Sequence, residues 1–278
     1  MSKILKTELK RSFQNKLFFI SLLISMALVL WYSIERLPAC LEKNATFGTD
    51  LMADDFLEIS FTNWIGSHNI YLQQNIFYII FPLLATLPFG GSFYSDINDG
   101  YIKNICIRIK KEEYLLSKYI AVFVSGGMAV VIPMIGSYLI SAAYLPTMLP
   151  ESSYAFTNIV SVNKWANLFF TFPFAYFLIY LLMMFIFSGF IACMSLMISY
   201  FSSKSFLPLV FPFFIYIFLS LTFEILNLNG YSIRNLLTTT DEYSTTLTVL
   251  VMCVLLFVLS FVPYYMIGVK KDVFAFEK

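Results

Sequence analysis

WANLFFTFPFAYFLIYLLMMFIFSGFIACMSLMISYF, residues 165–201, contains no charged side chain in 37 consecutive positions. A helix needs about 20 apolar residues to cross the hydrocarbon core of a bilayer, which is roughly 30 Å thick. This stretch would form about 55 Å of helix at 1.5 Å per residue. Tilt, a kink at Pro173 or protrusion beyond the bilayer must absorb the excess length. The stretch therefore predicts a membrane-spanning helix.

Five more segments are apolar enough to cross a bilayer and carry almost no charge. They are residues 17–34, 70–91, 119–145, 206–226 and 247–267. The whole chain is 59% hydrophobic and only 13% charged, against about 25% charged in globular proteins. We therefore expect an all-α, polytopic membrane protein, with residues 1–278 forming a single domain of six transmembrane helices. The composition excludes a disordered chain and a nucleic-acid binder with a basic face.

The basic residues predict how these helices are oriented. If residues 1–16 are cytoplasmic, 14 of the 18 Lys and Arg residues lie on the cytoplasmic side, but only 7 of the 17 acidic residues do. Lys and Arg accumulate in cytoplasmic loops, so both termini are expected in the cytoplasm. The abundance of Phe, Ile, Tyr, Lys and Asn is compatible with an AT-rich bacterial genome. We expect a multi-pass protein of a bacterial plasma membrane.

Residues 1–16 are expected to form an amphipathic helix on the cytoplasmic side of the membrane. Ile4, Leu5 and Leu9 define an apolar stripe together with Phe13, and lysines flank this stripe. This pattern is typical of a helix that lies at the inner headgroups of the membrane.

Small residues recur at helical spacing in two of the predicted spans. They are Ser125, Ala129, Ser137 and Ser141 in residues 119–145, and Ser188, Ala192, Ser195 and Ser199 in residues 165–201. Faces of small residues let helices approach closely. Two interpretations stay open: packing within the bundle, and a subunit seam or substrate path lined by hydroxyl groups.

Residues suited to catalysis or nucleotide binding are scarce. His68 is the single histidine, which excludes histidine-cluster metal sites, and the chain has no Gly-Lys dipeptide, which excludes a P-loop. We expect no catalytic, cofactor-binding or metal-binding residue in this chain, so any ATP and Mg²⁺ would be held by a partner subunit. The lack of charge at mid-membrane depth disfavours a proton-coupled carrier.

The cytoplasmic segment 92–118 carries the most informative pattern. Ile102, Ile105 and Ile109 repeat at spacings of three and four, while acidic and basic residues keep the other faces polar. This pattern predicts a surface helix around residues 95–108 that docks into a cleft of a partner. A plain interfacial connector is the alternative.

This segment, together with the six crossings and the amphipathic N-terminal helix, resembles the membrane subunit of ABC-2 type transporters. In that family, an acidic residue four positions before a glycine follows the second helix. A short helix, a basic residue and a Ser-Lys or Gly-Lys pair at the start of the third helix come next. The matching positions are Asp96, Gly100, Arg108 and Ser117-Lys118. The acidic residue is Asp where Glu is commoner in the family.

The resemblance implies a permease subunit of an ABC exporter, with 92–118 as its coupling segment and separate cytoplasmic ABC ATPase subunits as partners. A second permease copy or a paralogous permease would complete a path for an amphipathic, lipid-like, peptide or drug-like substrate, in contact with membrane lipids and without nucleic acid. Coupling to the ATPase would fall to Asp96, Gly100, Ile102, Ile105, Arg108 and Lys118. A non-transporting sensor or scaffold and, less favoured, a membrane-embedded lipid-modifying enzyme remain as alternatives.

Overall fold

The computed structural model describes residues 2–46, 58–67, 70–150, 159 and 163–270, and these residues form helices and connections without a strand. Five helices are long and apolar enough to cross a membrane. They are α2 (Lys16–Thr46), α6 (Lys111–Tyr144), α8 (Pro173–Ser199), α9 (Leu207–Ile225) and α11 (Thr246–Lys270). The predicted all-α class is confirmed, and the chain has the architecture of a multi-pass membrane protein.

Shorter elements connect and flank these five helices. They are α1 (Ser2–Phe13), η1 (Ser60–Thr62), α3 (Leu72–Thr86), α4 (Ser92–Asn98), α5 (Tyr101–Cys106), α7 (Ala166–Thr171), η2 (Asn229–Tyr231) and α10 (Ile233–Leu237). Both η2 and α10 lie between α9 and α11, and the α10 residues Ile233, Leu236 and Leu237 are buried.

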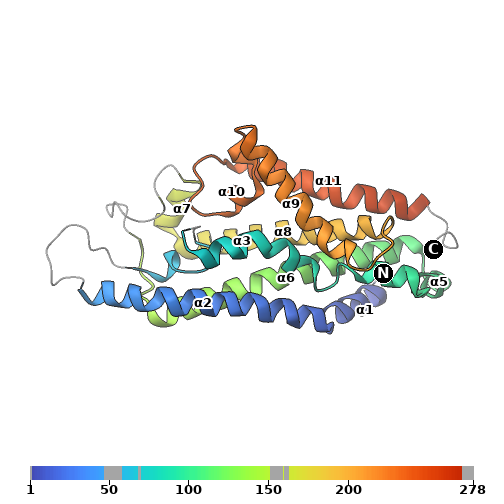
Figure 1. Ribbon diagram of the computed structural model, residues 1–278, viewed down its shortest axis with the longest axis horizontal. Coiled ribbons are helices and arrows are strands. Elements are labelled where there is room, and N and C mark those ends of the chain that lie inside the picture. Colours follow the sequence, from blue (N-terminus) through green and yellow to red (C-terminus); the bar gives the residue numbers. More distant parts are fainter. Residues whose placement is uncertain (1, 47–57, 68–69, 151–158, 160–162, 271–278) are drawn as a thin grey trace.

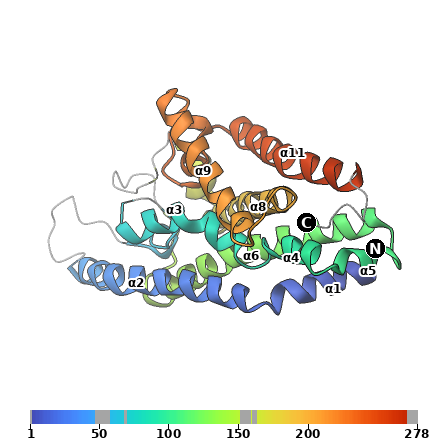
Figure 2. The ribbon, with the colours of Figure 1, turned by 45° about the vertical axis from the view of Figure 1, so that its right-hand side comes forward.

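Of the long helices, α2, α6, α8 and α11 run roughly along the longest axis of the molecule, whereas α9 is inclined to it (Figure 1). One end holds α1, α5 and the last turns of α11, and is called the α1 end below. The opposite end holds α7 and the last turns of α2, and is called the α7 end. Helices α6 and α8 pack against each other most extensively and form the centre. In Figure 2, α2 lies on one side of this centre, while α9 and α11 lie on the other.

The predicted span 165–201 is broken at Phe172, where the backbone leaves helical geometry (φ −139°, ψ 72°). Proline cannot donate a backbone hydrogen bond and is favoured in the first turn of a helix, so Pro173 begins α8. The break leaves α8 with 27 residues, about 40 Å of helix. The stretch 165–201 was expected to accommodate its excess length by tilt, by a kink at Pro173 or by protrusion beyond the bilayer. In the structure the helix is interrupted at Pro173.

The predicted span 70–91 contains a helix of only 15 residues, α3, followed by a turn that leads into α4. At 1.5 Å per residue α3 is about 22 Å long, less than one hydrocarbon thickness. Pro82 and Pro88 cannot donate to the carbonyls of Tyr78 and Leu84, four residues earlier. Hydroxyl groups of other helices do so instead: Tyr216 Oη donates to Tyr78 O at 2.9 Å, and Ser21 Oγ donates to Leu84 O at 2.7 Å.

Two glycines allow α6 and α8 to approach closely. A Cβ atom at Gly126 would lie 2.6 Å from Ala192 Cβ, and one at Gly189 would lie 2.7 Å from the Phe123 ring. Real Cβ atoms are not found so close to other atoms, so any larger residue forces the helices apart. The centre of the bundle is therefore a tight helix pair.

Candidate functional site

Four charged side chains form an ionic cluster at the α1 end, where α1, α4 and α6 meet; three of them are buried, and the side chain of the fourth, Arg11, is 35% exposed. Glu8 comes from α1, Asp96 from α4 and Lys118 from α6, and Arg11 of α1 lies between the two carboxylates. Glu8 and Lys118 have no exposed surface, and Asp96 is 2% exposed. A charge taken out of water costs several kcal/mol unless it is paired, so this clustering needs a specific geometry.

The geometry of the cluster is a closed ring of alternating charges. Lys118 Nζ lies 2.5 Å from Asp96 Oδ2 and 3.1 Å from Glu8 Oε2. On the other side, Arg11 Nη1 lies 2.7 Å from Glu8 Oε1, and Arg11 Nη2 lies 2.8 Å from Asp96 Oδ1. Each carboxylate therefore contacts both cations. Two positive and two negative groups balance, which is the condition for burying charge at low cost.

Tyrosine hydroxyls complete the coordination of the two carboxylates. Tyr114 Oη, one turn before Lys118 on α6, donates to Asp96 Oδ2 at 2.6 Å. Tyr101 Oη of α5 donates to Glu8 Oε1 at 3.3 Å. The cluster thus reaches four elements: α1, α4, α5 and α6.

Aromatic rings cover both cations. Lys118 Nζ lies 4.1 Å from the centroid of the Phe89 ring, and Arg11 Cζ lies 4.3 Å from that of Tyr101. A cation over the face of a ring is attracted by the π-electrons, and this attraction grows as water is excluded. The rings therefore contribute to holding the cations in place.

The ionic partners determine the charge state of Asp96. Burial alone would raise the pKa of the Asp96 carboxyl, but Lys118 and Arg11 outweigh burial and hold this pKa below its ordinary value. Burial likewise acts to lower the pKa of Arg11, and the neighbouring carboxylates raise it above its ordinary value. Both groups are therefore charged at neutral pH.

Glu8, Arg11 and Tyr114 were not among the residues predicted from the sequence. The buried face of α1 consists of Ile4, Glu8 and Ser12, spaced four apart, whereas Leu9 on the predicted stripe is only half-buried. Glu8 follows Ile4, a member of the predicted apolar stripe, by four residues and therefore shares its helix face; a carboxylate on an apolar face needs a cationic partner. This was the signal available in the sequence.

The single surface helix expected around residues 95–108 is instead two short helices, α4 and α5. Gly100 separates them in the left-handed region, at φ 68° and ψ 11°. A side chain there would crowd the backbone, so a continuous helix through this position is replaced by a sharp corner. The prediction of one helix was therefore wrong, because Gly100 acts as a turn residue.

The structure places the six predicted coupling residues in four different surroundings. Asp96 and Lys118 meet in the ionic cluster, and Gly100 forms the corner between α4 and α5. The α5 isoleucines face the core: Ile102 is 2% exposed, and Ile105 is partly buried. Arg108 is exposed and is not part of the cluster. Beside it lies Ile107, which the sequence analysis did not single out and which is 84% exposed.

All eight small residues of the two stripes are buried within this chain: Ser125, Ala129, Ser137, Ser141, Ser188, Ala192, Ser195 and Ser199. The hydroxyls of Ser125, Ser188, Ser195 and Ser199 donate to carbonyls of their own helices. The other two serines bind the segment that contains η1. Ser137 Oγ accepts from Ile65 N at 2.9 Å, and Ser141 Oγ donates to Asn63 O. These contacts favour the interpretation as packing faces.

Chemically, the ionic cluster is suited to joining helices. Each of its charged groups is engaged by a group of opposite charge, and the described residues contain no group of three or more His, Cys, Asp or Glu side chains placed to hold a metal ion. A displacement of one helix would pull on the others through short, charge-assisted bonds. No family model matches the chain, and no curated protein or solved structure matches it either.

Proposed function

We propose that this chain is the permease subunit of an ATP-driven ABC exporter of the ABC-2 type. In this proposal the chain crosses the plasma membrane six times with both termini in the cytoplasm. The short helix α3 and the turn after it make the second crossing. ATP and Mg²⁺ are bound by separate cytoplasmic ABC ATPase subunits. A second permease copy or a paralogous permease completes the path for an amphipathic, lipid-like, peptide or drug-like substrate.

The ionic cluster is the observation that carries this proposal. A permease without its own ATPase needs a cytoplasmic part that transfers movement to its spanning helices. Asp96 on α4 is bonded to Lys118 on α6 and to Arg11 on α1, so α4 cannot shift without moving either helix or breaking buried ion pairs. Breaking such a pair costs about 3–5 kcal/mol. Movement of α4 is therefore transmitted to the bundle.

The turn that follows α5 supplies a surface for the ATPase. Ile107 and Arg108 are exposed there, just beyond α5, while Ile102 on the same segment is buried against the bundle. An exposed isoleucine beside a basic residue suits an apolar cleft with an acidic rim on the partner. In the proposed cycle, dimerisation of the ATPases displaces this turn together with α5 and α4, and the ionic cluster carries the displacement to α6 and α1.

The experiment is affinity purification of the full chain from membranes of its native cell, followed by identification of co-purified proteins. We expect an ABC ATPase with Walker A and signature motifs. The amount of ATPase that co-purifies with the double variant Ile107→Asp/Arg108→Glu should be at least several-fold lower than with wild type. The control Lys10→Glu reverses a charge on an exposed position of α1, outside the turn after α5, and should leave the recovery of the ATPase unchanged.

Two outcomes would contradict the proposal. Absence of any ABC ATPase from wild-type preparations, even after chemical crosslinking in the membrane, would favour the sensor or scaffold. Equal recovery in the double variant and in wild type, with ATP hydrolysis still stimulated by the permease, would remove the coupling role of Ile107 and Arg108.

A further inference from the structure

One face of α1 is a row of exposed lysines, called the lysine row below. Lys3, Lys6 and Lys10 are spaced three and four residues apart, so they lie on one side of the helix, and all three are exposed. The opposite side, with Ile4 of the predicted apolar stripe and Glu8, is buried, and α1 packs against α6. Glu8 is the only acidic residue of α1. Every charge on the exposed face of α1 is therefore positive.

The lysine row has no counter-charge of its own. Within the described part of the chain, no salt bridge joins these three lysines to a carboxylate. A lysine ammonium is a compact charge with three hydrogen-bond donors, and it pairs with phosphate as a point charge. The lysine row is therefore suited to an anionic partner outside this chain.

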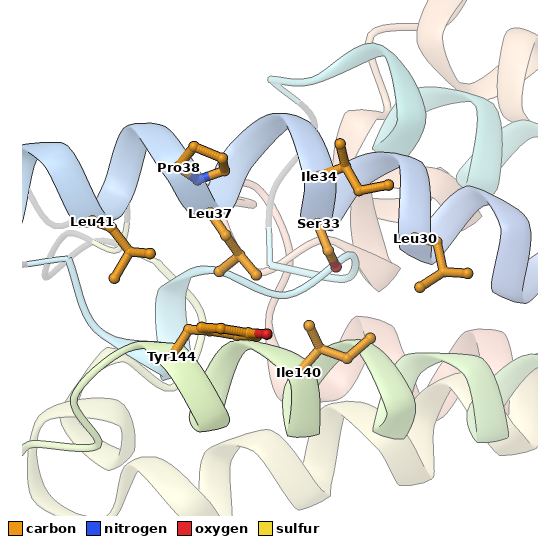
Figure 3. Close-up of a pocket in the computed structure, with 8 residues that line it drawn as sticks. All are labelled: Leu30, Ser33, Ile34, Leu37, Pro38, Leu41, Ile140 and Tyr144. Atoms are coloured by element: carbon orange, nitrogen blue, oxygen red, sulfur yellow. The ribbon is translucent and has the colours of Figure 1, made fainter.

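The lysine row lies directly beside a membrane-spanning helix. Only residues 14–15 separate α1 from α2, and the two helices follow the same edge of the molecule in Figure 2. On α2 the exposed positions are apolar, beginning with Leu17 and Ile20, which are 36% and 47% exposed. They continue at Leu30 and Ile34, which line an apolar groove beside α6 (Figure 3). Exposed apolar side chains on a spanning helix face lipid tails, so the hydrocarbon region begins near Leu17.

Part of the lysine row lies at the depth of the lipid headgroups. Lys10 is seven residues before Leu17, which is at most about 10 Å along a helix, and Lys6 is at most about 16 Å away. The headgroup layer extends about 5–8 Å beyond the hydrocarbon on each side. The long side chain of Lys10 reaches this layer. Lys6 lies within about 8 Å of it, one Debye length at physiological ionic strength.

We propose that Lys6 and Lys10 bind the phosphate groups of anionic phospholipids in the leaflet at the α1 end. Charge complementarity selects this class of lipid, because the positive headgroup of a zwitterionic lipid opposes the attraction of its phosphate to lysine. The membrane position selects a lipid over other polyanions, because these two lysines continue the lipid-facing side of α2. The inference does not depend on the proposed transport function.

The first test is native mass spectrometry of the full chain in a mild detergent, titrated with phosphatidylglycerol or with phosphatidylcholine of the same acyl chains. Wild type is expected to bind phosphatidylglycerol more tightly. A lysine near an anionic surface contributes about fivefold in affinity, so Lys6→Gln/Lys10→Gln should weaken phosphatidylglycerol binding at least about tenfold. Its affinity for phosphatidylcholine should not change.

The matched control is Arg108→Gln/Lys110→Gln. This variant also removes two positive charges from exposed positions, but in the turn after α5. Its affinity for phosphatidylglycerol should equal that of wild type.

A second measurement locates the lipid in a bilayer. The full chain is placed in vesicles with phosphatidylglycerol that carries a diazirine on its headgroup, and the labelled peptides are mapped after illumination. We expect label on residues 3–17 of wild type and much less on this segment of Lys6→Gln/Lys10→Gln. The label should also decrease in about 1 M salt, where the Debye length falls to about 3 Å.

Three outcomes would overturn the proposal. One is the same phosphatidylglycerol affinity in wild type and in Lys6→Gln/Lys10→Gln. Another is an equal loss of affinity in the Arg108→Gln/Lys110→Gln control, because only the net charge of the protein would then matter. The third is displacement of phosphatidylglycerol by millimolar inorganic phosphate, because the lysine row would then be a site for free anions.

Discussion

Lys118 keeps its ammonium group where no part of the side chain is exposed. Moving such an ion out of water costs several kcal/mol, and the attraction of Asp96 and Glu8 repays this cost only because the geometry is close. Two carboxylates face two cations, so the deletion of any one member leaves an uncompensated charge. The stability of this region is therefore sensitive to single substitutions.

Lys118→Met is expected to lower the stability of the folded protein by about 3–5 kcal/mol, because it leaves the two carboxylates with Arg11 alone. The measurement is the thermal unfolding midpoint in detergent, with Lys10→Met on the exposed face of α1 as the control. Adding Asp96→Asn to Lys118→Met should restore part of the loss, because it removes one of the orphaned charges. A midpoint for Lys118→Met equal to that of the control would contradict the role assigned to the cluster.

At the scale of elements, a second buried lysine joins two connections at the α7 end. Lys164, just before α7, donates from Nζ to Leu236 O at 2.7 Å and to Ser244 Oγ at 3.1 Å. Its backbone N–H also donates to Asp241 O at 3.4 Å. The connection before α7 is thus fastened to α10 and to the chain that leads into α11. These bonds fix elements that are far apart in the sequence.

The pH dependence of stability should reveal this fastening. Burial lowers the pKa of Lys164 from 10.5 to about 8, and the attraction of Asp241 offsets only part of this effect. Between these two pH values the unfolded chain holds a proton that the folded protein has released, so stability rises as the pH increases from about 8 to 10.5. Below about pH 8 this contribution is absent.

The thermal unfolding midpoint of wild type, measured from pH 7 to 10.5, should therefore rise relative to that of Lys164→Met. The exposed lysine control, Lys204→Met, should follow the wild-type profile. Parallel profiles for wild type and Lys164→Met would show that this lysine is not buried in the folded protein.

At the scale of the whole molecule, the contact between α6 and α8 holds the remaining helices in position. Both helices contact α3 and α11, and α6 also contacts α1 and α2, while α8 contacts α7 and α9. The spacing of this pair depends on glycines whose missing side chains leave room for the neighbouring helix. A change in that spacing would therefore shift the helices that contact α6 and α8.

Two Gly→Ala variants separate this packing effect from helix propensity. A Cβ atom at Gly189 would lie 2.7 Å from the Phe123 ring and 2.9 Å from Phe123 O. At Gly136 of α6 it would lie 3.4 Å from the flexible end of Met26. Alanine favours a helix over glycine by about 1 kcal/mol, so Gly136→Ala should raise the thermal unfolding midpoint slightly. Gly189→Ala should lower it, because overpacking costs about 1–3 kcal/mol. A higher thermal unfolding midpoint in both variants would contradict the close packing of α6 against α8.

Part of the candidate site was predictable, and the rest was not. The spacing of Asp96, Gly100 and Lys118 marked the correct segment, because the acidic, turn-forming and basic residues lie near one another in the chain. Glu8 was not predicted, because it lies 110 residues from Lys118 and meets it only when α1 docks on α6. Gly100 was singled out, but its left-handed backbone, and thus the corner between α4 and α5, appears only in the structure.

The sequence by itself determined that this protein is an all-helical membrane protein. Apolar length and the need to satisfy backbone hydrogen bonds inside a bilayer are local requirements, readable from one segment at a time. Only the tertiary structure decided which polar groups meet and what the serine stripes contact. Pairing of buried charges and close helix packing depend on side chains from distant segments, and their meeting is a property of the folded chain.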